Sequence, residues 1–545
     1  MDSERTARRR FMQGLAATAS AVPILAPEEF FASAPSGNRR TMPSPATPVA
    51  NVVFNVRDFG ARGDGRNPTT AALQSAIDAC AKAGGGKVVV PAGRYLTAPL
   101  FLRSNLELEL LSGAVLLGST QFSEYPAIEG RWEGLDRTVF ASLLTGMDLE
   151  NVAITGNGIL DGQGTVWREA HHETEELRKK TGLSGREPEN PVGSPLRWPR
   201  PRMINLYRCR NVRITGLSLR DCPSWNVHPV SCENIWIQGL SIVNPRDSAN
   251  TDGIDPDSCR NVRISDCYIS TGDDCIILKS GYKHIPGKPF QPTENVVVTN
   301  CVFGEGHCGV GIGSETAGGI RNVAISNCVC EGTRRGLYIK TARGRGSVIE
   351  NIQAVNFAMR NIENTAVAVN MFYSPADRER TAPVDETTPT VRNIHFAGVS
   401  VSGSARSIVF EGLPERPIES LSLRNVAVDS SSNGVICSQV NRLSLENVRV
   451  VCDQGPTIEV SDVRELDLVQ FGAAGKTAQQ PAIRLNRVQG ALVQGCSAPA
   501  GASPLVEVRG SGSSEISLSL NRVPKGGKEV EFTGGASPDS AARLG

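Results

Sequence analysis

Hydrophobic and polar residues alternate along most of this chain in short runs, with few stretches of helical period. One phrase recurs: an Asn, then Val or Ile, then alternating residues of β-branched character. The copies begin at Asn151, Asn211, Asn234, Asn261, Asn295, Asn322 and Asn351, with weaker ones at Asn393, Asn425 and Asn447. From Asn211 to Asn351 their spacing is roughly 23 to 34 residues. Gly, Asn, Asp and Ser separate the runs, which is typical of strands joined by turns.

A repeat of this length predicts an all-β fold, a parallel β-solenoid. Each coil would stack its strands on those of the next coil, about 4.8 Å away, so that inward residues form ladders. We expect the recurring Asn side chains to hydrogen-bond to one another along a turn. An antiparallel β-sandwich is the alternative, and it would leave the ten copies of the phrase unexplained.

Two segments depart from the repeat. Residues 70–82 have helical periodicity, with Thr69 or Thr70 as the N-cap, and predict a short helix that covers the open end of the solenoid. Residues 162–200 are charged and rich in proline. This insertion predicts a wall of an active site, which we favour, or an idle surface loop.

The first residues predict an export signal. Arg8-Arg9-Arg10-Phe11 precedes an apolar run from Gly14 to Leu25, and Ala32-Ser33-Ala34 offers a cleavage site for residues 1–34. The paired arginines favour the twin-arginine route, which would place the protein in the periplasm or outside the cell. A disordered basic tail before an apolar helix is the alternative.

The remaining boundaries follow from composition. We expect a Pro/Ser/Thr-rich linker over residues 35–50, a single β-helix catalytic domain over 51–525 and a flexible tail over 526–545. Lys plus Arg (57) nearly equals Asp plus Glu (56), so charge implies no nucleic-acid partner. Without an apolar run of about 18 residues, no stable membrane association is expected. We expect a monomer.

The 14 cysteines form no Cys-x-x-Cys pair and no Cys/His group with zinc spacing. Most lie within apolar runs that read as strands. The sequence therefore predicts buried, unpaired thiols stacked in the core.

Three carboxyls carry the candidate chemistry. Asp252 stands in Asn-Thr-Asp-Gly, and the pair Asp273-Asp274 follows 21 residues later, about one coil away. Like charges brought together raise the pKa of at least one member. A protonated carboxyl beside ionised ones suits glycosidic bond cleavage, which needs one acid and one base. The set predicts a glycoside hydrolase.

Two further residues fall in step with these acids. His307 follows Asp274 by 33 residues, and Lys340 follows His307 by another 33. A histidine beside carboxyls can hold one of them in a given protonation state. The Lys340 ammonium, on the same side of a strand as Tyr338, would bind an acidic sugar's carboxylate or balance the local negative charge.

These motifs, in this order, resemble the polygalacturonase family of pectin-degrading glycoside hydrolases, which fold as right-handed parallel β-helices. The matching segments are Asn250-Thr-Asp, Gly272-Asp-Asp, Gly306-His and Ile339-Lys, and the resemblance covers roughly residues 52–380. It implies a pectic polysaccharide or oligosaccharide as substrate.

The resemblance also implies an inverting mechanism without metal or cofactor. Asp273 would protonate the leaving oxygen, while Asp252 and Asp274 would activate the attacking water. His307 would support the site electrostatically. The sugar would contact Asn250, Lys340, Tyr338 and Tyr373.

This chain departs from the family at two positions. Tyr338 stands where an Arg generally helps to bind a galacturonate carboxylate, and Cys308 stands where a Gly follows the His. Tyr338 would stack on a neutral sugar, or Arg343 and Arg345 would supply the missing charge. Unmodified galacturonan and rhamnose-containing or substituted pectins are therefore both open as substrates.

Two other classes would use the same solenoid. A polysaccharide lyase would need a calcium-binding acidic cluster with an Arg or Lys base, which the acid and histidine set does not match. A carbohydrate-binding solenoid would have no reason to keep three acids together.

Overall fold

The computed structural model describes residues 52–181, 200–372, 377–378, 380–475, 480–499, 501–523 and 525–543. The predicted export signal and linker lie outside the described residues, as does Tyr373. All the described residues belong to one compact unit, residues 49–545.

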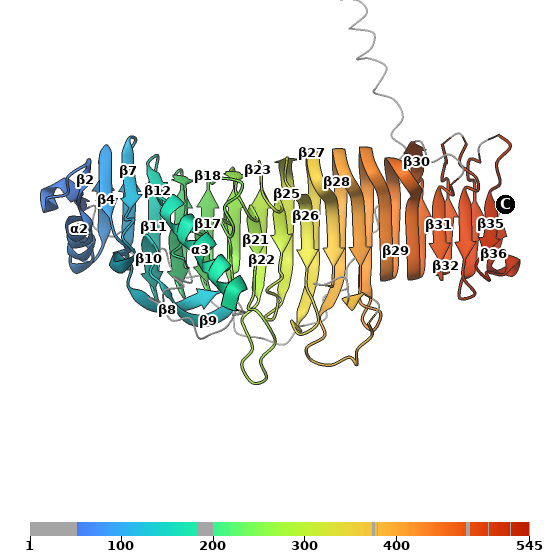
Figure 1. The fold of residues 1–545 in the computed structure, drawn as a ribbon, viewed down its shortest axis with the longest axis horizontal. Helices are drawn as coiled ribbons and strands as arrows, with labels where there is room; N and C mark the ends of the chain where they lie inside the picture. Colours follow the sequence, from blue (N-terminus) through green and yellow to red (C-terminus); the bar gives the residue numbers. More distant parts are fainter. Residues whose placement is uncertain are drawn as a thin grey trace, which may run out of the picture. The chain divides into compact units, whose positions relative to one another are not determined.

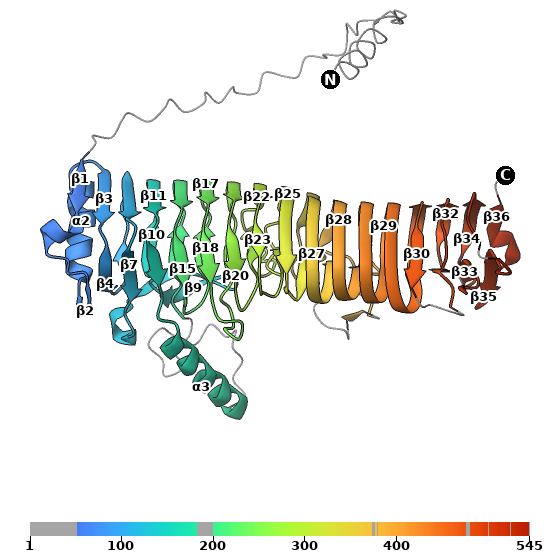
Figure 2. The same ribbon diagram turned by 90° about the horizontal axis from the view of Figure 1, so that it is seen from above.

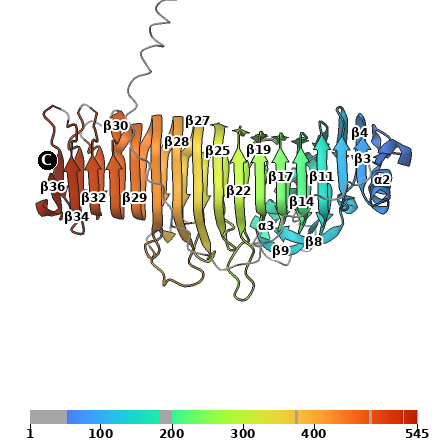
Figure 3. The ribbon, with the colours of Figure 1, turned by 180° about the vertical axis from the view of Figure 1, so that it is seen from behind.

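The chain coils so that strands one coil apart pair in parallel, and Figure 1 shows them side by side in sequence order. The pairings form three ladders. The first ladder, seen from behind in Figure 3, joins β1 (Val53–Asn55), β3 (Gly86–Val90), β6 (Leu106–Leu110), β11 (Glu150–Gly156), β14 (Arg210–Thr215), β17 (Glu233–Gln238), β19 (Arg260–Ser265) and β22 (Thr293–Thr299).

The other two ladders have the same order. The second joins β2 (Asp64–Pro68), β4 (Gly93–Thr97), β7 (Ala114–Gly118), β12 (Ile159–Asp161), β15 (Ser218–Arg220), β18 (Ser241–Val243), β20 (Tyr268–Ser270) and β23 (Val302–Phe303). The third contains β5 (Leu100–Phe101), β10 (Leu144–Met147), β13 (Ile204–Tyr207), β16 (Val227–Val230), β21 (Ile276–Leu278), β24 (Val310–Ile312) and β26 (Arg335–Lys340).

Farther along the chain, long strands run round the corners from one ladder to the next. They are β25 (Ile320–Glu331), β27 (Val348–Asn370), β28 (Thr390–Glu411) and β29 (Ile418–Val469). The coils then continue through β30 (Gly472–Gly475), β31 (Ile483–Asn486), β32 (Gln489–Gln494), β33 (Val506–Arg509), β34 (Ser514–Ser519), β35 (Val530–Thr533) and β36 (Ala541–Arg543).

The C-terminal boundary differs from the expected one. A flexible tail was expected over residues 526–545, yet β35 pairs in parallel with β33, and β36 pairs with β34. A short 3-10 helix, η4 (Pro538–Ser540), connects these two strands. The Gly-, Ser- and Pro-rich composition of this region reflects the turns between short strands, so the β-helix extends to Arg543.

Helix α2 (Thr70–Lys82) covers the N-terminal end of the coil, as predicted. Its Leu73, Ile77 and Cys80 side chains are buried in the same core as the first strands. Thr69 is the N-cap residue, but its hydroxyl donates to the Leu96 carbonyl instead of capping the helix. A 3-10 helix, η1 (Val56–Phe59), packs beside it.

The recurring asparagines form a hydrogen-bonded ladder at one turn. From Asn211 to Asn393, each side-chain amide donates to the side-chain oxygen of the Asn one coil earlier, at 2.9 Å for Asn211 to Asn151 and 3.0 Å for Asn261 to Asn234. Asn425 and Asn447 lie at another turn, where Asn447 donates to Asn425. The φ values of all these asparagines lie between +52° and +59°. Asn tolerates this left-handed conformation better than most residues, and the turn needs it at every coil. The predicted Asn ladder is therefore confirmed.

The core inside the coil is apolar and contains the thiols. All 14 cysteines are buried and unpaired, as predicted. Several stack between coils: the backbone N–H of Cys209 donates to Cys232 Sγ at 3.2 Å, and that of Cys232 donates to Cys259 Sγ at 3.4 Å. No helix in the described part of the chain has the length and apolar character needed to cross a membrane.

Two insertions leave the coil. The first contains η2 (Phe122–Glu124) and an antiparallel hairpin of β8 (Ala127–Trp132) and β9 (Leu135–Phe140). The second contains α3 (Thr165–Thr181), which projects to one side of the ladders in Figure 2. Trp167 of α3 is fully buried against Tyr125 and Phe140, so aromatic packing fixes the helix to the first insertion.

Candidate active site

The third ladder brings the acids onto neighbouring coils. Ile254 forms a parallel bridge to Ile276, which places Asp252 and Asp274, each two residues earlier, in register. The N–H of Gly253 donates to the Asp274 carbonyl at 3.0 Å. Adjacent strands in a sheet lie about 4.8 Å apart. The predicted juxtaposition of these acids therefore follows from the register of the coil.

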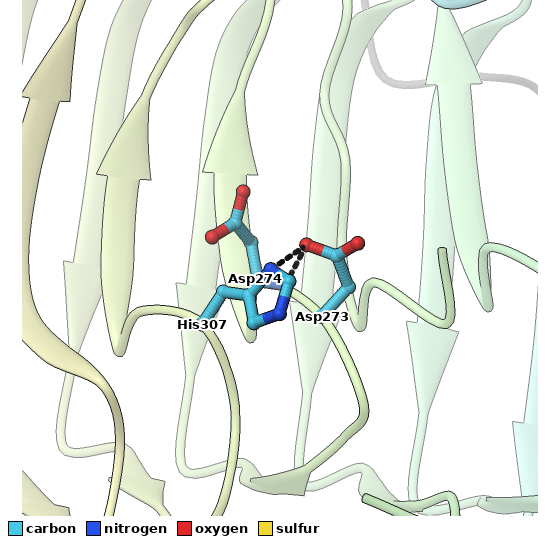
Figure 4. A group of neighbouring side chains, drawn as sticks. All are labelled: Asp273, Asp274 and His307. Atoms are coloured by element: carbon cyan, nitrogen blue, oxygen red, sulfur yellow. Dashed lines mark hydrogen bonds and ion pairs between the residues drawn. The ribbon is translucent and has the colours of Figure 1, made fainter. Parts of the chain in front are cut away.

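Asp273 is paired with His307. Figure 4 shows the imidazole facing the Asp273 carboxylate, with Asp274 beside them, and His307 Nδ1 lies 2.8 Å from Asp273 Oδ1. Burial raises the pKa of Asp273, but the hydrogen bond and positive charges of His307 and Lys340 outweigh it and lower the pKa to about 2. The same hydrogen bond raises the pKa of His307. The pair therefore favours an ionised Asp273 beside a protonated His307.

Asp274 is held by Lys340, whose Nζ donates to Asp274 Oδ2 at 2.8 Å. Burial lowers the pKa of Lys340, but the charge of Asp274 outweighs it and raises the pKa. The ammonium is therefore permanently charged. The second oxygen, Asp274 Oδ1, is buried and has no hydrogen-bond partner among the described residues.

Asp252 lies deeper, in a buried cluster with Asp255 and Lys279. Lys279 Nζ donates to Asp252 Oδ2 at 3.0 Å and to Asp255 Oδ2 at 2.9 Å. Burial and then the neighbouring Asp255 charge raise the pKa of Asp252 well above its usual value, and burial raises that of Asp255 to about 7. The single Lys279 ammonium thus balances the negative charge of one carboxylate, and the raised pKa values favour a proton on the other carboxyl.

The sequence analysis missed Asp255 and Lys279. Both residues could have been found from the sequence, because they directly follow the Asp252 and Asp274 motifs. The parallel bridge between Asp257 and Lys279 places Lys279 on the coil next to these acids. The Lys279 ammonium also lies 3.9 Å from the centroid of the Trp225 ring, which stabilises its charge by a cation–π contact.

Asn250 joins the site to the second insertion. Its backbone N–H donates to Asp273 Oδ2 at 3.2 Å, and its side-chain oxygen accepts from the Arg200 guanidinium at 2.8 Å. Burial lowers the pKa of Arg200 to about 10. Arg200, the last residue of the 162–200 segment, is therefore linked to Asp273 through Asn250, which agrees with the predicted wall at this one residue. Residues 182–199 lie outside the described residues.

Tyr338 lies on β26 beside Lys340, as expected, with Lys340 Nζ 5.4 Å from its ring centroid. Arg335 of the same strand also lies over the ring, at 4.4 Å. Sequence reasoning did not single out Arg335. Cys308 is fully buried, and its Sγ would lie 2.7 Å from a Cβ at Gly311. Gly311 therefore leaves room for the Cys308 side chain.

Arg343 and Arg345 are engaged elsewhere. Arg343 Nε donates to Glu415 at 2.5 Å, and its other nitrogens donate to the Asp377 and Arg380 carbonyls. Arg345 is buried and donates to the Tyr282 carbonyl and to Ser314 Oγ. The expectation that either would replace the family's arginine is therefore not supported.

Asp273, Asp274 and His307 offer ligand atoms within 4.8 Å of one another, a spacing that a divalent cation would accept. The Lys340 ammonium, 2.8 Å from Asp274, opposes a second positive charge at the same carboxylate.

Glycoside hydrolases use paired carboxyls, one as acid and one as base or nucleophile, and here carboxyls in contrasting charge environments lie on adjoining coils of a parallel β-helix. Comparison with known proteins supports this class. The Glycosyl hydrolases family 28 profile matches residues 193–452, and a profile for Rhamnogalacturonase A/epimerase, pectate lyase-like, matches residues 53–128.

A probable polygalacturonase of Vitis vinifera is 33% identical over 417 residues, covering 73% of this chain and 80% of its own. An exo-poly-alpha-D-galacturonosidase of Dickeya chrysanthemi is 28% identical over 455 residues, covering 76% and 74%. The crystal structure of a hyperthermoactive exopolygalacturonase from Thermotoga maritima aligns with a TM-score of 0.61 at 29% identity, covering 77% of this chain and 92% of its own.

The chain therefore belongs to glycosyl hydrolase family 28. The predicted glycoside hydrolase class and the resemblance to polygalacturonases are both confirmed. The predicted fold, an all-β right-handed parallel β-helix, is confirmed by the parallel ladders and the structural neighbours.

Proposed function

We propose that this protein hydrolyses glycosidic bonds in galacturonate-containing pectic chains with inversion at the anomeric carbon. The observation that carries the proposal is the set of three adjoining acids with different partners: Asp273 with His307, Asp274 with Lys340, and Asp252 with Lys279. Groups with similar chemistry in contrasting environments can serve as acid and base in one reaction.

Asp273 is the general acid in this proposal, although its pKa is low without substrate. A bound chain excludes water and brings its own negative charge, and both effects raise the pKa of a carboxyl. The proton on His307 Nδ1, 2.8 Å away, then moves to Asp273 and from there to the leaving oxygen. The glycosidic C–O bond breaks as this proton arrives.

Asp274 and Asp252 position the attacking water. Both carboxyls keep one oxygen, Oδ1, without a hydrogen-bond partner among the described residues. Lys340 donates a hydrogen bond to Asp274 Oδ2 and so orients this carboxyl. Asp274 then accepts a proton from the water while the water oxygen bonds to the anomeric carbon. Asp252, with the raised pKa, orients the water from the deeper side.

The test is to incubate the protein with de-esterified galacturonate oligomers and follow the products by proton NMR. Initial formation of the β-anomer from α-linked substrate, lost in Asp273→Asn, is the expected result. Asp467→Asn, which changes an exposed carboxylate, is the control and should retain activity. An initial α-anomer would overturn inversion, and full activity in Asp273→Asn would overturn the assignment of the acid.

Rhamnose-containing or substituted pectins are a second candidate substrate, favoured by one observation. Tyr338 presents an aromatic ring in the site, and such a ring can stack on a sugar that carries no charge. Cleavage of these pectins, without cleavage of the galacturonate oligomers, would establish this alternative.

A metal-dependent lyase makes a different prediction. It would lose activity with a chelator and form products that absorb in the ultraviolet, whereas the proposed hydrolase keeps full activity in excess EDTA and forms no such product. Activity restored by added calcium after chelation would contradict the proposal of a metal-independent hydrolase.

We further propose export by the twin-arginine route and action as a monomer. The support is the sequence Arg8-Arg9-Arg10-Phe11 ahead of an apolar run. Arg8→Lys with Arg9→Lys should retain the protein in the cytoplasm of a bacterial host. Light scattering on the retained, uncleaved protein should give the 58.1 kDa mass of one chain, and twice that mass would contradict a monomer.

A further inference from the structure

One strand of the site holds two cations against a single aromatic ring. On β26, the Arg335 guanidinium carbon lies 4.4 Å from the centroid of the Tyr338 ring, and Lys340 Nζ lies 5.4 Å from it. Burial raises the pKa of Tyr338, so the phenol is neutral. The ring is a platform that attracts cations without neutralising them.

The two cations differ in their partners. Lys340 donates to Asp274 at 2.8 Å, so part of its charge is already balanced. Across the described residues, Arg335 has no ion pair, and its guanidinium makes no hydrogen bond. Its side chain is partly exposed. It is therefore a cation fixed in orientation but with its donors unused.

The position of Arg335 follows from the register. Ile276, Val310 and Leu337 pair on successive coils, so Asp274, Cys308 and Arg335, each two residues earlier, occupy one column. The backbone N–H of Arg335 donates to the His307 carbonyl at 3.1 Å. Arg335 thus stands on the coil next to the histidine that pairs with Asp273.

We propose that Arg335, held over the Tyr338 ring, binds the carboxylate of a uronate residue in the substrate. This inference rests on the proposed function and deepens it, because it assigns the charge that selects an acidic sugar. A guanidinium presents a planar fork of donors that matches a carboxylate, which a point charge such as Lys340 does not. Stacking on Tyr338 fixes the fork before substrate arrives and so reduces the entropy lost on binding.

The proposal also accounts for the departure at position 338. In the polygalacturonases that this chain resembles, an arginine at that position contacts galacturonate. Here Tyr338 carries no charge at that position, but its ring packs against the guanidinium of Arg335, three residues earlier on the same strand. Specificity for a uronate is thus kept by a different residue.

The experiment compares Arg335→Gln with wild type on two matched substrates, a de-esterified galacturonate oligomer and its methyl-esterified form. We expect kcat/KM on the de-esterified oligomer to fall about 10- to 100-fold, the range for losing a charged hydrogen-bonded pair. On the esterified oligomer kcat/KM should be nearly unchanged. Arg335→Lys should recover part of the loss, since it keeps charge without the fork.

Arg360→Gln is the matched control, because Arg360 is an exposed arginine of β27 that pairs with Glu331 away from the site. It should leave both substrates unaffected. No loss in Arg335→Gln, or an equal loss on both substrates, would overturn the proposal, since a purely structural role would not discriminate between acid and ester.

Binding measured without turnover separates the inference from the proposed function. Calorimetry with the de-esterified oligomer compares Asp273→Asn with the double variant Asp273→Asn/Arg335→Gln, and the second should bind about 10-fold or more weakly. A wild-type protein that binds but never cleaves would refute the proposed hydrolysis while leaving this comparison decisive. Equal affinity in the two variants, or no binding by either, would overturn the role of Arg335.

Discussion

The asparagine turn and the acidic column are both built from polar side chains stacked coil upon coil, but their neighbours relate in opposite ways. In the turn, each Asn amide donates to the previous Asn and accepts from the next, as Asn261 does at 3.0 and 3.1 Å. In the column, Asp252 and Asp274 present like charges to one another, and balance comes from Lys279 and Lys340 on other positions. The turn supports itself, whereas the site depends on counter-charges.

The contrast separates stability from function. A ladder of identical amides gains a hydrogen bond with each coil, so repetition stabilises it. A column of carboxyls becomes less stable with each added carboxyl, because burial and mutual repulsion disfavour the ionised form. Asp252 and its partners therefore reduce the stability of the coil, and we expect them to be present because they are needed for catalysis.

Removing one acid should expose this cost with the largest effect. Asp252→Asn leaves Lys279 paired with Asp255 alone, so we expect the free energy of unfolding at pH 7 to stay level or rise. At the same time kcat should fall about 10²- to 10⁴-fold, the usual contribution of such a group. Urea denaturation and initial rates measure the two quantities. A clearly less stable variant with retained kcat would reverse the assigned roles of the column.

Removing the counter-charge should have the opposite effect on stability. Lys279→Met leaves two buried carboxyls without their cation, and loss of one partner from a buried ion pair costs about 3–5 kcal/mol. The loss should be smaller at pH 5, where the two carboxyls bind protons instead. Lys283→Met, at an exposed lysine on a nearby loop, is the control and should stay within about 0.5 kcal/mol of wild type. A loss equal at both pH values would argue against the charge explanation.

The pH dependence of stability sharpens the same point. Asp255 has a folded pKa of about 7, above that of an unfolded Asp, so the stability it contributes is complete below about pH 4 and is lost as pH rises through 7. The raised pKa of His307 acts in the same direction at higher pH. The free energy of unfolding should fall between pH 4 and 8, by at most about 1.4 kcal/mol per pH unit for one group. Asp255→Asn should flatten this slope below pH 7, and an unchanged slope would assign it to other groups.

Much of this architecture could be predicted because it repeats. The Asn phrase marks a turn that every coil needs, and α2 carries a helical period with bounds that match the prediction. The acids could be predicted because Asp252 and the pair Asp273-Asp274 are spaced by about one coil, and a purely structural role explains such a spacing of carboxyls poorly. In both cases a local pattern recurs at the interval that the fold itself imposes.

The remaining features depend on contacts that no local pattern encodes. Arg200 reaches Asn250 across 50 residues, from the end of an insertion that has no repeat. The β8–β9 hairpin brings Arg131 to Asp257 at 3.0 Å, more than a hundred residues away. Arg335 shares the parity of the inward-facing Leu337, so alternation alone predicts a core position. Only the register of the coils places it at the site.

The smallest expected effect tests the turn side of the comparison. Asn261→Ala removes two ladder hydrogen bonds and places a Cβ residue without a polar group at a φ of +58°. Asn261→Gly removes the same bonds but relieves the backbone, so it should be the more stable variant by about 1 kcal/mol. Urea denaturation of both variants measures this difference, and kcat should be unchanged in each because the turn carries no charge of the site. If the Ala and Gly variants were equally destabilised, the hydrogen bonds alone would explain why Asn recurs at this turn. The left-handed backbone conformation would then contribute nothing to that preference.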